Sequence, residues 1–122
     1  MSTAKKTDGL KTFDIDHQEA SVDIWDKKYR LKDHDSSPVD VTIDDTFKRV
    51  AKAISEVEET DKQDQCYEEF LWALRSGAIP AGRIMSNAGS MEYKPATSTI
   101  NCTVSGSIQD SMSGILDKVT EA

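Results

Sequence analysis

Hydrophobic positions recur with helical spacing in the segment that follows Asp44. Side chains three or four residues apart lie on one face of an α-helix, and the apolar positions here are Phe47, Val50, Ala51, Ile54 and Val57. Asp44 is predicted to cap this helix, because a carboxylate can accept hydrogen bonds from the free N–H groups of the first turn. The pattern therefore predicts an amphipathic helix of about three to four turns.

A second helical pattern follows a few residues later. Thr60 and Gln63 have the spacing of a capping box, and Gly77 is placed to end the helix as its C-cap. The apolar positions between them are Cys66, Tyr67, Phe70, Leu71, Ala73 and Leu74. We predict two antiparallel helices joined by a short acidic turn.

The pattern before these helices is weaker. Residues 1–20 mix charged and small side chains with scattered apolar ones, a composition typical of a frayed or disordered tail. Residues 22–31 follow, as either a short helix or an irregular docking segment, and residues 32–38 are predicted to form a loop. The predicted anchors of residues 22–31 are Ile24, Trp25 and Tyr29.

The chain changes character after Ile79. Small residues, prolines and glycines dominate up to Ser107, and the β-branched residues at 99–105 predict one buried strand. Asp110 is predicted to cap a third helix, with its apolar face made by Met112, Ile115, Leu116 and Val119. This helix reaches the last residue without a breaker, and a single strand needs neighbours for its backbone groups. We therefore expect the chain to be a fragment whose sheet is completed by other sequence.

The charge, the lack of a long apolar stretch and the cysteine content argue against several classes of function. The formal net charge is −7 and no basic cluster interrupts the acidic background, which argues against non-specific nucleic-acid binding. No stretch approaches the roughly 20 apolar residues that span a bilayer, so we expect no membrane association and a cytoplasmic location. Cys66 and Cys102 belong to no CxxC or Cys/His cluster, so no metal site is expected.

Candidate chemistry is concentrated in the second half of the chain. The glycines of the segment Pro80–Gly89 would let backbone N–H groups approach a ligand, or would simply shape turns. Asn101 and Cys102 place a thiol beside hydrogen-bonding groups, although Cys102 would also serve as a small buried strand residue. Asp110 and Ser111 would bind a hydroxyl group or cap the helix that follows. These residues alone do not name a reaction.

Taken together, these segments resemble the large, catalytic subunit of ribonucleotide reductases, and most closely the adenosylcobalamin-dependent class. The likeness covers roughly residues 20–122. The segments that carry it are Val22–Tyr29, Pro38–Phe47, Pro80–Gly89, Ser98–Cys102 and Asp110–Met112. The resemblance implies a mainly α N-terminal domain over residues 21–78. It further implies that residues 79–122 form the first strand and helix of a ten-stranded α/β barrel.

The resemblance also implies an activity and its residues. Such enzymes reduce ribonucleotides to deoxyribonucleotides for DNA synthesis by thiyl-radical chemistry. Cys102 matches one cysteine of the redox-active pair, which reduces the ribose and becomes a disulfide, and Asn101 and Cys102 match positions that contact the bound nucleotide. Gly82 and Arg83 match a segment near the substrate phosphates.

Cofactor and partners follow from the same resemblance. Adenosylcobalamin would generate the radical, although an iron-dependent relative stays open. Asp110, with Ser111 beside it, matches an acidic position that reads the sugar of a deoxynucleotide or ATP effector at the interface of a homodimer. The cysteine that pairs with Cys102 and the cysteine that becomes the radical lie further along the family's sequence, so we expect this chain to be inactive alone.

Two alternatives stay open at this point. The chain would be a split subunit that associates with a separately encoded reductase remainder, as the lone predicted strand suggests. It would otherwise be a small structural domain that keeps the likeness without the activity.

Overall fold

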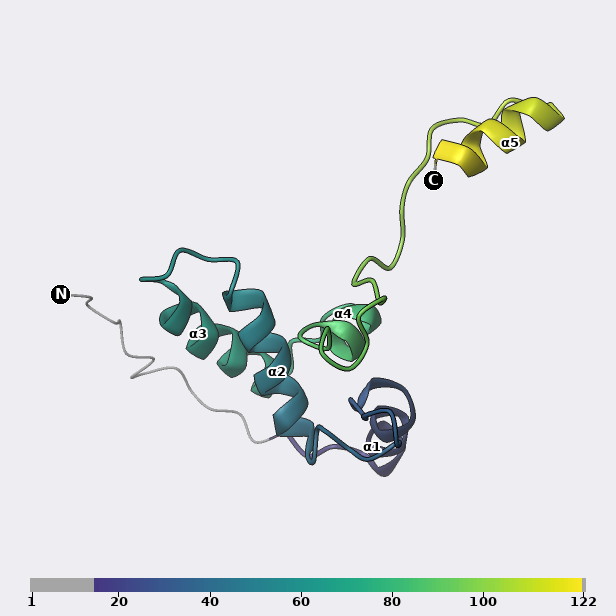
Figure 1. Cartoon of the computed structure of the whole chain (residues 1–122). Helices are drawn as coiled ribbons and strands as arrows, with labels where there is room; N and C mark the ends of the chain where they lie inside the picture. The colour runs from purple at the N-terminus through teal and green to yellow at the C-terminus, as the bar shows by residue number, and fades with distance from the viewer. Residues whose placement is uncertain (1–14, 122) are drawn as a thin grey trace.

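The computed structural model describes residues 15–121, and it is mainly helical (Figure 1). No strand occurs within this range, where the only β-type pairing is an isolated antiparallel bridge between Lys32 and Pro38. The elements in chain order are α1 (Glu19–Ile24), the π-helical turn η1 (Trp25–Tyr29), α2 (Ile43–Ser55), α3 (Gln63–Arg75), α4 (Gly82–Asn87) and α5 (Met112–Glu121).

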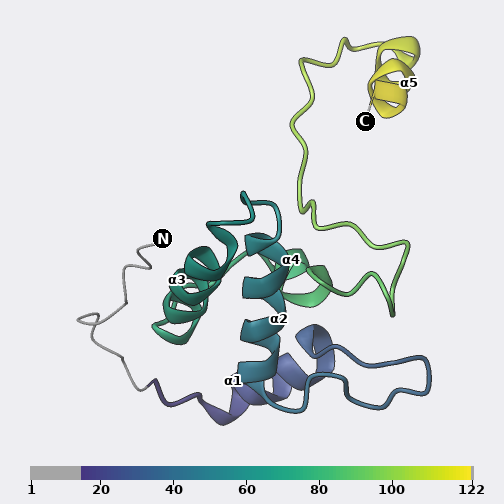
Figure 2. The same ribbon diagram turned by 60° about the vertical axis from the view of Figure 1, so that its left-hand side comes forward.

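The paired helices predicted from periodicity are α2 and α3. Their packing forms the core of the molecule (Figure 2). An ion pair joins Asp44, at the start of α2, to Arg75, at the end of α3, with 2.7 Å between Oδ1 and Nε. The helices therefore run antiparallel, as expected. The buried side chains of the core are Val50, Ala51, Leu71, Leu74 and Ala88.

The start of α2 differs from the prediction. Thr42 is the N-cap: its hydroxyl accepts from the N–H of Asp45 at 3.3 Å, and the Asp45 carboxylate accepts from the N–H of Thr42 at 2.9 Å. The prediction that Asp44 caps the helix was wrong, because Asp44 already lies inside the first turn. Val57 was also misplaced: α2 ends at Ser55, and Val57 is 83% exposed.

Of the predictions for the two ends of α3, one was wrong and one is confirmed. The predicted capping box of Thr60 and Gln63 does not form, since Lys62 is the N-cap and the Gln63 side chain donates instead to carbonyls at the end of α2 and in the turn. Gly77 does end the helix as predicted. Its φ is +103°, its N–H donates to Leu74 O, and the next N–H donates to Ala73 O. This pattern is the Schellman motif, in which glycine adopts the left-handed conformation at low cost.

The N-terminal segment is attached to α2 through Trp25. The indole Nε1 donates to Thr46 Oγ1 at 2.9 Å, so Trp25 is an anchor as predicted. Ile24 is not, because it is 47% exposed. The predicted tail at residues 1–20 falls mostly outside the described residues, and its last two residues belong to α1.

The C-terminal part of the described chain departs most from expectation. Residues 99–105 form no strand and are exposed, which corrects the prediction of a buried strand. The physical reason is that no neighbouring strand is present to pair with their backbone groups. Helix α5 forms as predicted but lies apart from the other helices (Figure 1). Of the first barrel strand and helix expected for residues 79–122, the described residues therefore show the helix but not the strand.

Candidate functional site

Helix α4 carries two of the candidate substrate-binding residues, Gly82 and Arg83. Gly82 is its first residue and lies against the ring of Tyr29, where an added Cβ would be 3.3 Å from Cε1. A side chain at this position would press on the tyrosine ring. The structure thus gives Gly82 a packing role, and the expected contact with substrate phosphates stays a prediction.

Two other candidates meet at the same helix. The backbone N–H of Arg83 donates to Asn101 Oδ1 at 3.3 Å, and Arg83 Nη1 donates to Ile100 O at 2.9 Å. One turn further along α4, Asn87 Nδ2 donates to Ser98 O at 2.8 Å. The structure therefore brings together Gly82, Arg83 and Asn101, which are distant in sequence. Cys102 follows directly, with its thiol free and exposed.

The candidate effector residues lie elsewhere, at the start of α5. Ser111 Oγ accepts from the N–H of Gly114 at 3.1 Å, which is the contact of an N-cap serine with the third residue of a helix. The prediction that Asp110 caps this helix was therefore wrong: Ser111 does so. Asp110 is exposed. The structure does not place these two residues beside the cluster at α4 (Figure 1).

A buried ion pair that was not predicted from the sequence lies between α2 and α4. Asp40 and Arg49 have side chains only 4% and 9% exposed, and Arg49 Nη2 lies 2.9 Å from Asp40 Oδ2. The same carboxylate oxygen accepts from Thr46 Oγ1 at 2.7 Å and from the N–H of Leu31 at 3.2 Å. Because Thr46 also accepts from Trp25, one connected network joins the N-terminal segment to α2.

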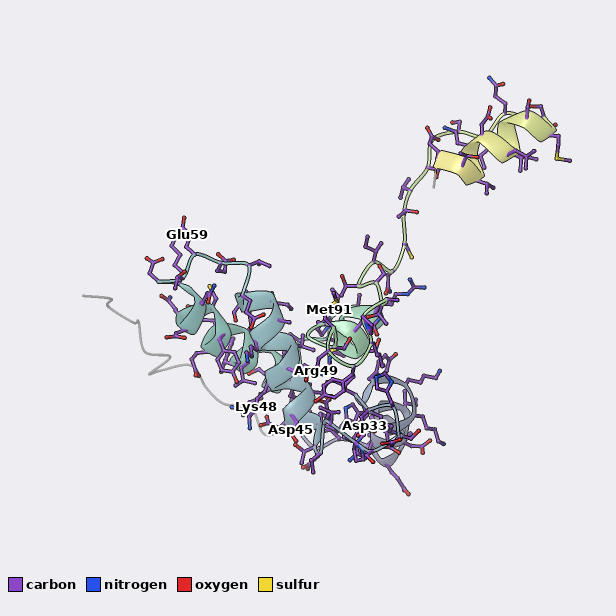
Figure 3. All side chains as sticks on the ribbon, in the orientation of Figure 1. Asp33, Asp45, Lys48, Arg49, Glu59 and Met91 are labelled. Atoms are coloured by element: carbon purple, nitrogen blue, oxygen red, sulfur yellow. The ribbon has the colours of Figure 1, made fainter. Side chains whose placement is uncertain are left out.

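Arg49 extends this network to α4. Its Nη2 donates to Met85 O at 2.8 Å and its Nη1 to Ala88 O at 2.6 Å. In Figure 3, Arg49 lies on the side of α2 toward α4, whereas Lys48 lies on the other side. A sequence signal for this was present, since Thr46 and Arg49 share a helical face with Val50. Polar residues at positions of that kind indicate a buried polar contact.

Gly89 completes the contact between α2 and α4. Its φ is +71°, and an added Cβ would lie 3.1 Å from Arg49 Cγ and 3.2 Å from Arg49 O. Only a residue without a side chain permits both the left-handed backbone and this close approach. Of the two readings of this glycine, the structure supports the shaping of a turn.

The described residues offer no evident metal or thiol-pair site. Among residues 15–121, no three His, Cys, Asp or Glu side chains come together in a way that could hold a metal ion. Cys66 and Cys102 are both free, and partial burial raises the pKa of the Cys66 thiol.

Among residues 15–121, no helix is both long enough and apolar enough to cross a membrane.

These contacts define a small helical domain. The buried ion pair of Asp40 and Arg49 stabilises the short helix α4. Helix α4 in turn binds residues 98–101, the irregular segment directly before Cys102. The family model for the ribonucleotide reductase all-alpha domain matches residues 15–92, more than half of the chain. The chain therefore belongs to the ribonucleotide reductase large-subunit family. Searches of curated proteins and of solved structures find no match.

Proposed function

We propose that this chain contributes the all-alpha domain and the first catalytic-site segment of a ribonucleotide reductase large subunit of the adenosylcobalamin-dependent class. The observation that carries the proposal is the contact between α4 and residues 98–101, which leaves Cys102 at the edge of the all-alpha domain. A segment held in this way is suited to enter a neighbouring catalytic domain with its thiol exposed.

The proposed chemistry assigns Cys102 one half of a dithiol. In the whole enzyme, a cysteine radical would take the ribose 3′-hydrogen, and two thiols would supply two electrons and two protons. The ribose would lose its 2′-hydroxyl as water while the thiols become a disulfide. Asn101 would contact the nucleotide, and Arg83, a permanent cation, would lie near its phosphates.

Adenosylcobalamin would supply the radical in this class. The described residues do not fit this cofactor. A hollow of about 600 Å³ is lined mainly by small and aliphatic side chains of α2, α4 and residues 97–100, and no cluster of metal-ligating side chains borders it. On this proposal the cofactor binds to other domains of the whole enzyme.

Effector binding at Asp110 and Ser111 is part of the same proposal. Both residues are exposed at the start of α5, so they are accessible to a partner subunit or a nucleotide. Ser111 as helix cap still has an oxygen able to accept a second hydrogen bond. In a homodimer, this end of α5 would lie at the subunit interface, with the deoxynucleotide or ATP effector beside it.

The test uses this chain joined to the remaining domains of a cobalamin-dependent reductase. Cys102→Ser should abolish ribonucleotide turnover driven by an external dithiol, because a hydroxyl cannot form the disulfide. Cys66→Ser is the matched control and should retain turnover, because Cys66 lies on α3 away from the cluster. Undiminished turnover in Cys102→Ser would contradict the role given to Cys102. Restored turnover on mixing the two parts as separate chains would support a split subunit.

A further inference from the structure

Arg49 lies where three parts of the molecule meet. Its guanidinium donates to the buried carboxylate of Asp40 and also to the carbonyl oxygens of Met85 and Ala88. These carbonyls belong to the C-terminal turn of α4, where no following helical N–H groups are available to them. A cation at this end also interacts favourably with the helix dipole. Arg49 therefore fixes α4 by the end opposite to Gly82.

Helix α4 in turn fixes the segment before Cys102. Arg83 and Asn87 donate three hydrogen bonds to residues 98–101, at 2.8–3.3 Å. These residues are exposed and belong to no helix or strand. Their position therefore depends on these contacts more than on burial, and a displacement of α4 would move them.

We infer that Arg49 is a positioning residue for Cys102, acting through α4, and that Asp40 holds Arg49 in the required orientation. The inference rests on the role proposed above for Cys102. Groups that react must be held to within a fraction of an ångström, so a second layer of contacts is needed to keep them there. Asp40, Arg49 and Gly89 supply that layer without touching the candidate site.

Arginine is required by the geometry of these contacts. A planar guanidinium reaches a carboxylate and two carbonyl oxygens in fixed directions, whereas a lysine ammonium is a compact charge on a flexible stem. Arg49→Lys should keep the charge facing Asp40 while losing at least one bond to α4. Arg75→Lys is the matched control, because Arg75 also pairs with an aspartate, Asp44 in the first turn of α2, but its hydrogen bonds go to that carboxylate and not to α4.

The test measures the position of Cys102 directly in the whole 122-residue chain. In a Cys66→Ser background, one nitroxide is placed on Cys102 and a second on Lys52→Cys, an exposed position of α2. Pulsed electron paramagnetic resonance then gives the distribution of distances between the two labels. We expect one narrow distribution in the parent and in Arg75→Lys, and an increase in width of about twofold in Arg49→Lys, because α4 becomes locally free.

An unchanged distribution in Arg49→Lys, with helical content retained, would overturn the inference. If that variant fails to fold, Asn87→Ala provides the second measurement, since it removes only the bond from α4 to Ser98. It should also widen the distribution, and an unchanged width there would overturn the inference as well. The distance measurement needs no turnover. Failure of the Cys102→Ser prediction would remove the redox role while leaving the coupling of Arg49 to residues 98–101 measurable.

Discussion

The helical body (residues 19–94) and the C-terminal arm (residues 102–121) have similar hydrophobic patterns but different surroundings. In the body, the apolar face of α2 is covered by α3 and α4. In the arm, the apolar face of α5 is open: Met112, Ile115, Leu116 and Val119 are 45–72% exposed. Periodicity therefore predicts that a helix forms and which face it would bury, but it does not say what covers that face.

The largest contrast is expected from the same substitution made in both regions. Leu71→Ala should lower the free energy of unfolding by about 2–5 kcal/mol, because it leaves a cavity in the core formed by α2 and α3. Leu116→Ala in the arm should change it by about 0.5 kcal/mol or less, as for exposed sites generally. Urea unfolding followed by circular dichroism measures both. Equal losses would show that α5 is buried in solution and would remove the distinction between body and arm.

A smaller contrast is expected between two glycines. Gly89→Ala should cost about 1–2 kcal/mol of unfolding free energy, because an L-residue is strained at positive φ and its Cβ would lie 3.1 Å from Arg49 Cγ. Gly106→Ala in the arm is the control. Its Cβ would meet only Lys118 Nζ, at 3.5 Å. Thermal unfolding of the two variants makes the comparison, and a neutral Gly89→Ala would mean that α4 is not held closely against α2.

The smallest expected effect is a pH dependence of the unfolding free energy, caused by an ion pair of the helical body. The hydrogen bond from Arg75, assisted by Lys48, lowers the pKa of Asp44 from 3.8 to about 2. The stabilisation is therefore complete above the unfolded pKa and is lost as the pH falls from about 4 to about 2. Asp44 is 39% exposed, so solvent screening limits the contribution to about 0.5–1 kcal/mol.

Asp44→Asn isolates this contribution. The difference in unfolding free energy between the parent and the variant should shrink as the pH is lowered from 5 to about 2, measured by urea unfolding at each pH. A constant difference across that range would show that the ion pair between α2 and α3 does not stabilise the folded state in solution.

Much of the body could be predicted from the sequence, because its helices depend on local spacing. The start of α2 could not be placed correctly, since Thr42, Asp44 and Asp45 all favour helix starts and only the backbone decides among them. The buried pair was missed for a related reason. Arg49 shares a helical face with Val50, but Asp40 lies in a loop nine residues earlier. Nothing in the spacing of the two residues shows that the fold brings them together.

The candidate site was predictable only in part. Resemblance selected Arg83 and Asn101, and the structure places them in contact. Their roles with substrate, and those of Cys102, Asp110 and Ser111, stay predictions. The strand at residues 99–105 was wrong because β-branched residues express a preference that only a neighbouring strand can satisfy.

Arg49 bonds residues that lie far from it in the sequence, and this has a consequence for the order in which the domain folds during synthesis. Its partners lie at sequence separations of 9, 20, 36 and 39 residues. During synthesis, Asp40 and Tyr29 leave the ribosome before Arg49, whereas Met85 and Ala88 follow much later. Helices α2 and α3 can pair first, but Ala88 completes their core only when α4 has emerged. The nascent domain therefore reaches its final packing in a late step, shortly before the segment that carries Cys102 emerges.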